Sequence, residues 1–258
     1  MEKVLIYTFI AALAIFSFGN LQAEDELPST YTVSLSQDPA FGFYPSVNAA
    51  IPLSNTTALT FYGIFWTSAA TASHSTSADI GLNLMTEFGV GMNFTMMDGA
   101  LNINPSIGFG NGLYQSGSAR PVVADNIVPN VYASYVSGNF SLSFGGVAWM
   151  AMRKEGPVQI DMYDYNISPM VAVHKNIAVG LYLDHYLYTT KQTVKGKDES
   201  ETATGYFWLG PCIKLNVAKS ATVSFMAGLD LVDQFNDNLA DDDKIIKDFY
   251  KLTTSISF

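Results

Sequence analysis

Charge, cysteine and histidine are scarce in this sequence of 258 residues. Lysine, arginine, aspartate and glutamate make up 14% of it, whereas an average soluble domain carries about 25%. One cysteine excludes an intramolecular disulfide framework and a cysteine-rich zinc site, and three histidines leave few other zinc ligands. The net charge of −10 is the opposite of the basic footprint that nucleic-acid binding needs. We therefore expect no metal site, no cofactor and no nucleic-acid partner.

Long apolar runs are also scarce, and the single long one lies near the N-terminus. Residues 4–18 are apolar, follow Glu2 and Lys3, and lead into a segment that ends at Ala23. At about 15 residues this run is shorter than the roughly 20 that a membrane-spanning helix needs. The pattern predicts a secretory signal peptide over residues 1–23 and a mature chain over residues 24–258. An N-terminal membrane anchor is the alternative interpretation.

The sequence does contain a hydrophobic pattern with a period of two. Over residues 80–96, apolar side chains such as Val90 alternate with glycine, asparagine, glutamate and threonine. Residues 101–109 repeat the alternation after Asp98-Gly99, a dipeptide typical of tight hairpin turns. Side chains that alternate in this way point to opposite faces of a β-strand. The pattern therefore predicts an all-β chain.

Short turns and longer polar segments follow one another along the mature chain. We expect short turns at residues 54–57, 98–99, 138–139, 174–176 and 218–220. We expect longer loops at residues 71–79, 114–126, 154–160, 192–202 and 233–246. With an opening strand at residues 30–36 and a last strand at residues 247–258, the pattern predicts twelve strands. An even strand number and alternating loop lengths are typical of a transmembrane antiparallel up-and-down β-barrel.

A soluble β-sandwich also has alternating strands, so the chemistry of the two faces matters. The polar face of a sandwich meets water and should be rich in lysine and glutamate. Here that face carries mostly glycine, serine, asparagine, threonine and tyrosine. The apolar face carries phenylalanine, leucine, isoleucine, valine and methionine on nearly every strand. A closed barrel pairs every backbone group within lipid, so we favour the barrel over the sandwich.

The end of the chain adds a resemblance to a known class. Phe258 is the last residue, and Tyr250, Leu252 and Ile256 share its face of the strand. This ending resembles the terminal strand of bacterial outer-membrane β-barrels, although Thr254 departs from the pattern. The resemblance implies that these four residues are read by the barrel-assembly machinery, and that outer-membrane lipid and lipopolysaccharide surround the chain. The length and strand number also look similar to small channel families such as the nucleoside-specific channels.

Charged side chains on the inward face are the candidate selectivity residues. Parity places six of them in the lumen: Glu87, Asp164, Asp184, Asp230, Lys214 and Lys251. Rings of carboxylates favour cations over anions. The alternative is that these charges pair with one another and plug the barrel. A bulge at Gly145-Gly146 would also reverse the parity of Arg153.

Aromatic side chains on the same face are the second candidate set. Parity places five of them inward: Tyr44, Tyr182, Tyr186, Tyr206 and Trp208. They would narrow a pore or stack on a planar solute such as a sugar or nucleobase. The alternative is that they only fill the lumen.

These observations predict a pore in the bacterial outer membrane for passive diffusion of small hydrophilic solutes, with a mild preference for cations. A non-conducting structural or surface-binding barrel is the second interpretation, and an outer-membrane enzyme is the third. A hydrolase needs an oriented base, and Asp184-His185 is the best acid–histidine pair in the sequence. Adjacent residues of a strand point to opposite faces, so this pair cannot form a simple dyad. We therefore expect no catalytic residues.

Overall fold

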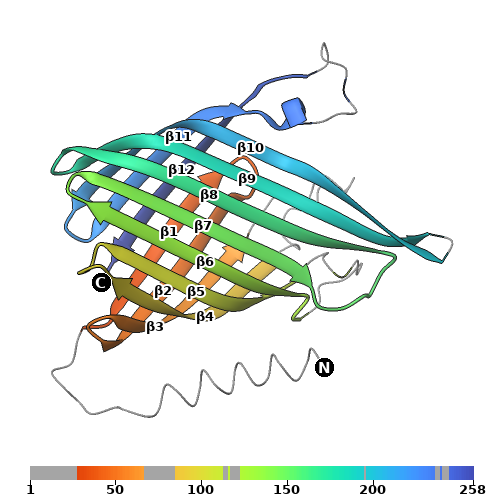
Figure 1. Cartoon of the computed structure of the whole chain (residues 1–258), viewed down its shortest axis with the longest axis horizontal. Coiled ribbons are helices and arrows are strands. Elements are labelled where there is room, and N and C mark those ends of the chain that lie inside the picture. The colour runs from red at the N-terminus through yellow and green to blue at the C-terminus, as the bar shows by residue number, and fades with distance from the viewer. Residues whose placement is uncertain are drawn as a thin grey trace.

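The computed structural model describes residues 28–66, 85–112, 116, 123–194, 196–235, 239 and 244–258. These residues form one closed antiparallel barrel in which sequence neighbours pair and β12 pairs with β1 (Figure 1). The twelve strands are β1 (Thr30–Asp38), β2 (Gly42–Ser54), β3 (Thr57–Trp66), β4 (Met85–Met96), β5 (Leu101–Asn111), β6 (Asn126–Ser137), β7 (Phe140–Ala151), β8 (Val158–His174), β9 (Ile177–Val194), β10 (Lys197–Ala218), β11 (Ala221–Asp230) and β12 (Lys247–Ser257). A short 3-10 helix, η2 (Val232–Phe235), follows β11. The predicted all-β, twelve-stranded barrel is confirmed.

One rim of the barrel carries the five short turns predicted from the sequence. Tight turns at residues 55–56, 97–100, 138–139, 175–176 and 219–220 join strands at one rim. The start of β1 and the C-terminus lie at this same rim (Figure 1). The predicted signal peptide at residues 1–23 and the predicted loop at residues 71–79 lie outside the described residues. No helix among the described residues has both the length and the apolar character to cross a membrane.

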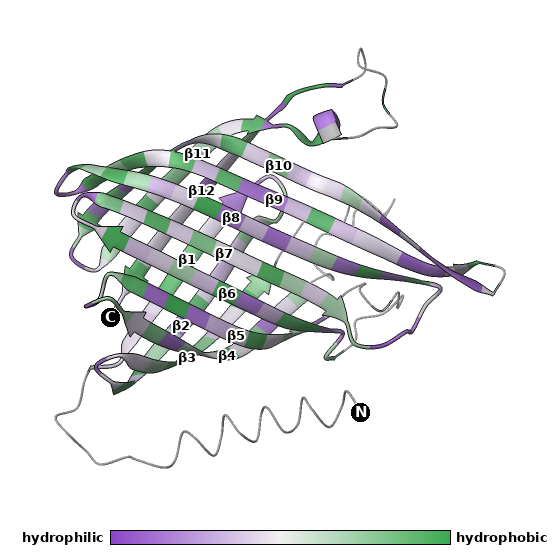
Figure 2. Cartoon of the chain, in the orientation of Figure 1, coloured by the Kyte–Doolittle hydropathy of each residue, from purple (hydrophilic) through white to green (hydrophobic). Residues whose placement is uncertain are grey.

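The alternation of side chains along each strand separates an apolar outer face from a polar inner face. Val33, Leu35, Phe88 and Phe225 point outward and are between 39% and 48% exposed on the isolated chain. Apolar and polar residues alternate along the strands in Figure 2. A single closed sheet with its apolar side outward has no second sheet to pack against, which rules out the sandwich.

The predicted loop at residues 192–202 is wrong, because β9 and β10 continue through it as a hairpin. Val194 pairs with Lys197 across a turn that contains Gly196 at φ +78°. The hydroxyls of Thr189 and Thr202 lie 2.9 Å apart across the two strands. This hairpin projects well beyond the neighbouring strands (Figure 1). Threonine favours strands, and a strand surrounded by water needs no apolar face. The polar composition of this segment therefore predicted a loop where the structure has a hairpin.

The bulge considered at Gly145-Gly146 does not occur. Both glycines pair in continuous register with β6 and with β8. The inward parity of β7 is therefore kept as far as Trp149, which is buried. Arg153 lies beyond the end of β7, is exposed, and donates a hydrogen bond to the carbonyl of Val123 at 2.8 Å.

The barrel closes at a seam between β1 and β12 that carries hydroxyl side chains on its inner face. Three pairs face each other: Thr32 with Ser257 at 2.9 Å, Ser34 with Ser255 at 2.8 Å, and Ser36 with Thr253 at 3.1 Å between the hydroxyl oxygens. Cross-strand hydroxyl pairs contribute roughly 0.2–1 kcal/mol each. The first and last strands are thus joined by small polar groups.

Glycine at position 210 is required by a close approach of two strands. A Cβ at Gly210 would lie 2.1 Å from the carbonyl oxygen of Ala227 and 2.7 Å from the Cα of Gly228. Backbone atoms cannot rotate away, so Gly210→Ala is expected to lower the free energy of unfolding by about 1–3 kcal/mol. Gly146→Ala is the control, because its nearest neighbours are movable ring atoms of Phe144 at 3.3 Å. Urea unfolding followed by circular dichroism measures both, and equal effects would contradict the prediction.

Candidate functional site

The turn between β1 and β2 is built around a buried carboxylate. Asp38 has no exposed surface. Its Oδ1 accepts hydrogen bonds from the backbone N–H groups of Ala40 at 3.0 Å and Phe41 at 2.7 Å. Its Oδ2 accepts a hydrogen bond from the hydroxyl of Tyr44 at 2.9 Å. Gly42 then begins β2 at φ +67°, a backbone conformation that glycine adopts without strain. Asp38 thereby fixes the shape of this turn.

Phe41, at the tip of this turn, crosses the lumen. Its ring centroid lies 5.0 Å from that of Trp66 on β3, 6.1 Å from Tyr186 on β9 and 6.2 Å from Tyr206 on β10. Four strands separate β3 from β10 by the shorter route around the barrel, so the two lie on nearly opposite walls. We call Phe41, Tyr44, Trp66, Tyr186 and Tyr206 the aromatic constriction.

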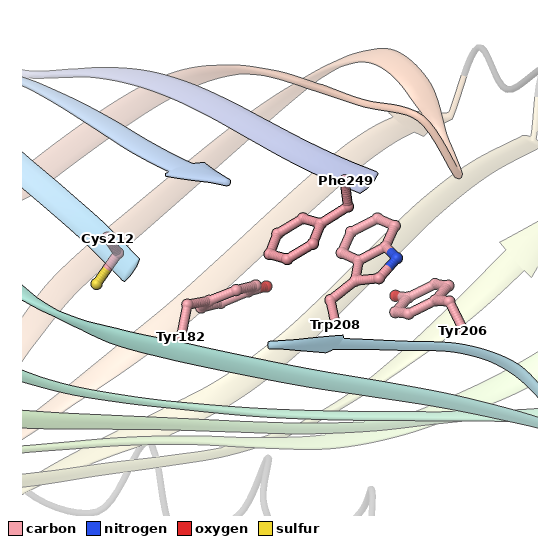
Figure 3. Packing of buried hydrophobic residues seen from close by; sticks show 5 residues of the cluster. All are labelled: Tyr182, Tyr206, Trp208, Cys212 and Phe249. Carbon is pink, nitrogen blue, oxygen red and sulfur yellow. The ribbon is translucent and has the colours of Figure 1, made fainter. Parts of the chain in front are cut away.

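A stack of aromatic rings continues from the constriction along the inner wall. The ring centroids of Tyr206 and Trp208 lie 4.0 Å apart, and those of Trp208 and Phe249 lie 5.0 Å apart with their planes nearly parallel. Figure 3 shows Tyr182 beside this stack, at the end where Phe249 lies. Trp208 is only 2% exposed. The ring faces therefore contact one another rather than solution, and the stack thickens this wall.

A second buried carboxylate lies beside the constriction. Glu87 on β4 is 1% exposed. Its Oε2 accepts hydrogen bonds from the indole Nε1 of Trp149 on β7 at 2.7 Å and of Trp66 on β3 at 3.3 Å. The indole rings of Trp66 and Trp149 meet edge to face. Glu87 thus joins the constriction to the wall formed by β4 and β7.

A third group of charges combines acids of β8 and β9 with a lysine of β12. Lys251 Nζ lies 3.5 Å from Asp184 Oδ2 and donates a hydrogen bond to the Tyr182 hydroxyl at 3.1 Å. The Tyr182 hydroxyl also donates to Asp184. Asp164 is a diagonal neighbour of Asp184 on the inner face, because Asp164 pairs with Tyr186 and Asp184 pairs with Asn166. The structure therefore brings Asp164, Asp184 and Lys251 together.

Asp230 and Lys214, also expected in the lumen, lie away both from this group and from Glu87. Asp230 ends β11, and its Oδ1 accepts backbone hydrogen bonds from Phe207 and Val232, both at 3.1 Å. Lys214 is exposed and pairs with Ala178, close to the short-turn rim. Asp230 therefore acts as a cap on the chain, and Lys214 faces water near the rim.

The residues expected to carry the assembly signal all lie on the outer face of β12 or just beyond it. Tyr250, Leu252, Ile256 and Phe258 are exposed on the isolated chain. The backbone of Phe258 exchanges hydrogen bonds with Tyr31 at 3.2 and 2.8 Å. This places the last residue beside the first strand, at the seam.

Sequence reasoning missed five inward residues: Asp38, Phe41, Trp66, Trp149 and Phe249. Parity would have found Trp149 and Phe249, because they share faces with Ser141 and Lys251. Phe41 lies in a turn, where alternation does not define a face. The sequence offers no comparable signal for its inward position.

Asp184 and His185 point to opposite faces of β9. Asp184 is fully buried in the lumen. His185 lies on the outer face between the rings of Tyr165 and Phe207, at centroid distances of 5.1 and 5.0 Å. These two side chains therefore cannot act together as an acid–base dyad.

Four carboxyl groups and one ammonium group lie around the constriction. The acids are Asp38, Glu87, Asp164 and Asp184, and the base is Lys251. Carboxyl groups therefore outnumber ammonium groups in this part of the lumen.

Three comparisons place the chain among known proteins. The sequence profile of a family of unknown function, DUF6733, matches residues 1–258. Among curated proteins, none matches. The COG4313 outer membrane channel from Pseudomonas putida F1 is similar in structure, with a TM-score of 0.55 and 11% identity over 93% of this chain and 100% of that chain.

Two porins are more distant in structure. The NanC porin has a TM-score of 0.48 and 9% identity over 88% of this chain and 98% of that chain. The KdgM porin has a TM-score of 0.43 and 10% identity over 88% of this chain and 99% of that chain. The likeness to the Pseudomonas channel shows that the chain has the barrel fold of a bacterial outer-membrane protein.

Proposed function

The chain belongs to the family of unknown function DUF6733, and from the side chains of its lumen we propose that it is a narrow, cation-preferring channel of the bacterial outer membrane. It carries small hydrophilic solutes by passive diffusion. On this proposal residues 1–23 are the signal peptide for export, and lipid and lipopolysaccharide surround the outer face. The barrel-assembly machinery reads Phe258 and the outward residues before it.

The charge around the constriction is the observation that carries this proposal. Four carboxyl groups and one ammonium group lie inside the lumen, where the ring of Phe41 contacts Trp66. Twelve strands lie between filled barrels of about 8 strands and open porins of about 16. The lumen of a barrel of this size is narrowed by side chains, so a small solute passes close to their charges and is selected by its own charge.

Planar bilayer recording tests the proposal. The purified barrel is expected to give stepwise currents and a reversal potential that favours K⁺ over Cl⁻ in a KCl gradient. Asp164→Asn is expected to lower the permeability ratio about fivefold, since one unit charge at 4 Å contributes about 1 kcal/mol in water. Asp98→Asn is the matched control, because Asp98 is exposed in the β4–β5 turn at φ +54°, which asparagine tolerates.

Two outcomes contradict the channel. One is an anion preference in the wild-type protein, and the other is silence from protein that is folded by its heat-modifiable mobility. Silence would favour a second candidate, a structural barrel that conducts nothing. The observation behind that candidate is the stack of Tyr206, Trp208 and Phe249, whose rings are almost fully buried.

A further inference from the structure

The side chain of Lys251 places one ammonium group inside the lumen of the barrel. Its Nζ contacts Asp184 Oδ2 at 3.5 Å and the Tyr182 hydroxyl at 3.1 Å. It also lies 5.5 Å from the centroid of the Tyr182 ring, a distance typical of cation–π contacts. Carboxylate, hydroxyl and ring face together form the environment that a primary ammonium group prefers.

Two carboxylate oxygens next to Lys251 have no hydrogen-bond donor. Asp184 Oδ1 and Asp164 Oδ1 are both buried without a donor from the backbone or from another kind of side chain, and the two carboxyl groups contact each other. Asp184 has no exposed surface at all. A buried charged acceptor without a donor is strongly unfavourable, so this place calls for a ligand that supplies N–H or O–H groups.

The charge of the group also calls for a cation. Lys251 interacts electrostatically with Asp38, Asp164 and Asp184, and Asp164 interacts with Asp184. One ammonium group therefore faces three carboxyl groups. Like charges held side by side in a buried site destabilise each other unless a positive charge lies among them. An anionic solute would add to this repulsion, and a neutral sugar would leave it uncompensated.

A primary ammonium group meets both requirements, because it carries one positive charge and three N–H donors. Aromatic rings adjoin the two acids, since Tyr186 pairs with Asp164 and Tyr182 donates to Asp184. Their faces and edges suit the methylene groups of a small amine. A tetraalkylammonium ion has the charge but no donor, so it satisfies only one of the two requirements.

We propose that Asp164 and Asp184 form a binding site for the primary ammonium group of a small organic amine that passes through the barrel. The amine donates to the two open Oδ1 atoms, while Lys251 keeps its contacts with Asp184 Oδ2 and Tyr182. The inference rests on the proposed channel function, because the lumen is the route by which the amine reaches these residues. It names the solute class of that channel.

Methylammonium and tetramethylammonium are the probes that test the site in planar bilayers. Methylammonium is expected to reduce the K⁺ current in a saturable way, and tetramethylammonium at equal concentration is expected to leave it almost unchanged. Asp164→Asn and, separately, Asp184→Asn should weaken the methylammonium block about tenfold or more, the loss expected for one charged hydrogen bond. Asp98→Asn should leave the block unaltered.

Calorimetric titration of the refolded barrel in detergent separates the site from the channel. Saturable heat with methylammonium that is lost in Asp164→Asn supports the site, even where bilayers show no current and the channel proposal fails. A conducting barrel that responds equally to both probes, with no change in either variant, overturns the amine site and leaves the channel standing. Heat-modifiable mobility of each variant confirms that it is folded, and Asp184→Asn provides the second test where Asp164→Asn does not fold.

Discussion

Replacing Phe41 by alanine is expected to raise the single-channel conductance severalfold. The Phe41 ring extends from the β1–β2 turn to Trp66 on one wall and to Tyr186 and Tyr206 on the other. Removing the ring leaves the backbone of the turn in place, because Asp38 holds it through backbone N–H groups and Tyr44. The gap between the walls then opens to water and ions.

Phe43→Ala is the matched control for this experiment. Phe43 belongs to the same hairpin but points outward and is 48% exposed on the isolated chain. The Phe43→Ala substitution removes the same atoms from the lipid side of the barrel, so the conductance should stay at the wild-type value. A conductance unchanged in Phe41→Ala, or raised equally in both variants, would show that the turn does not limit the current. The lost ring contacts are worth about 0.5–1.5 kcal/mol each, which a closed barrel tolerates.

Replacing Glu87 by alanine is expected to lower the free energy of unfolding by about 2–6 kcal/mol, because each of two donors left without an acceptor costs about 1–3 kcal/mol when buried. The two donors considered are the indole N–H groups of Trp66 and Trp149, and the Tyr62 hydroxyl also hydrogen-bonds Glu87. Glu87→Gln keeps an acceptor oxygen at the same place and should cost less. Urea unfolding in detergent, followed by circular dichroism, measures the difference between the two variants.

A double-mutant cycle tests whether this effect runs through Trp149. Trp149→Phe removes the indole donor and keeps an aromatic ring in the wall. In the Glu87→Ala background the same change should cost much less than in the wild type, because the donor has already lost its acceptor. Additive costs in the cycle would show that Glu87 stabilises the barrel by another route.

Period-two alternation predicted most of the barrel, since lipid on one side and a polar lumen on the other enforce it on each strand. The expected last strand at residues 247–258 became β12 at Lys247–Ser257. The alternation does not identify strands that extend out of the membrane into water. At residues 192–202 both faces of the hairpin meet water, and the absence of an apolar face there resembled a loop. Strand pairing, rather than side-chain polarity, decides the structure of that segment.

The candidate site was only partly accessible to the same reasoning. Parity places Glu87, Asp184 and Trp208 inward, and in the structure all three are buried in the lumen. Parity cannot say which inward residues meet across the barrel, because that depends on the stagger of strands far apart in sequence. The contact of Lys251 with Asp184 and the reach of Phe41 from a turn both depend on that stagger.

The hydroxyl seam between β1 and β12 bears on how the sheet becomes a cylinder. Its two strands come from opposite ends of the described chain and are separated by ten strands along the sequence. Each hydroxyl can act as donor or acceptor, which lets the edges settle into register without a unique orientation of either partner. Six paired positions, from Thr32–Ser257 to Gln37–Leu252, form a shorter joint than the long pairing of β9 with β10. We therefore expect the pairing of β1 with β12 to close the cylinder last and to open first on unfolding.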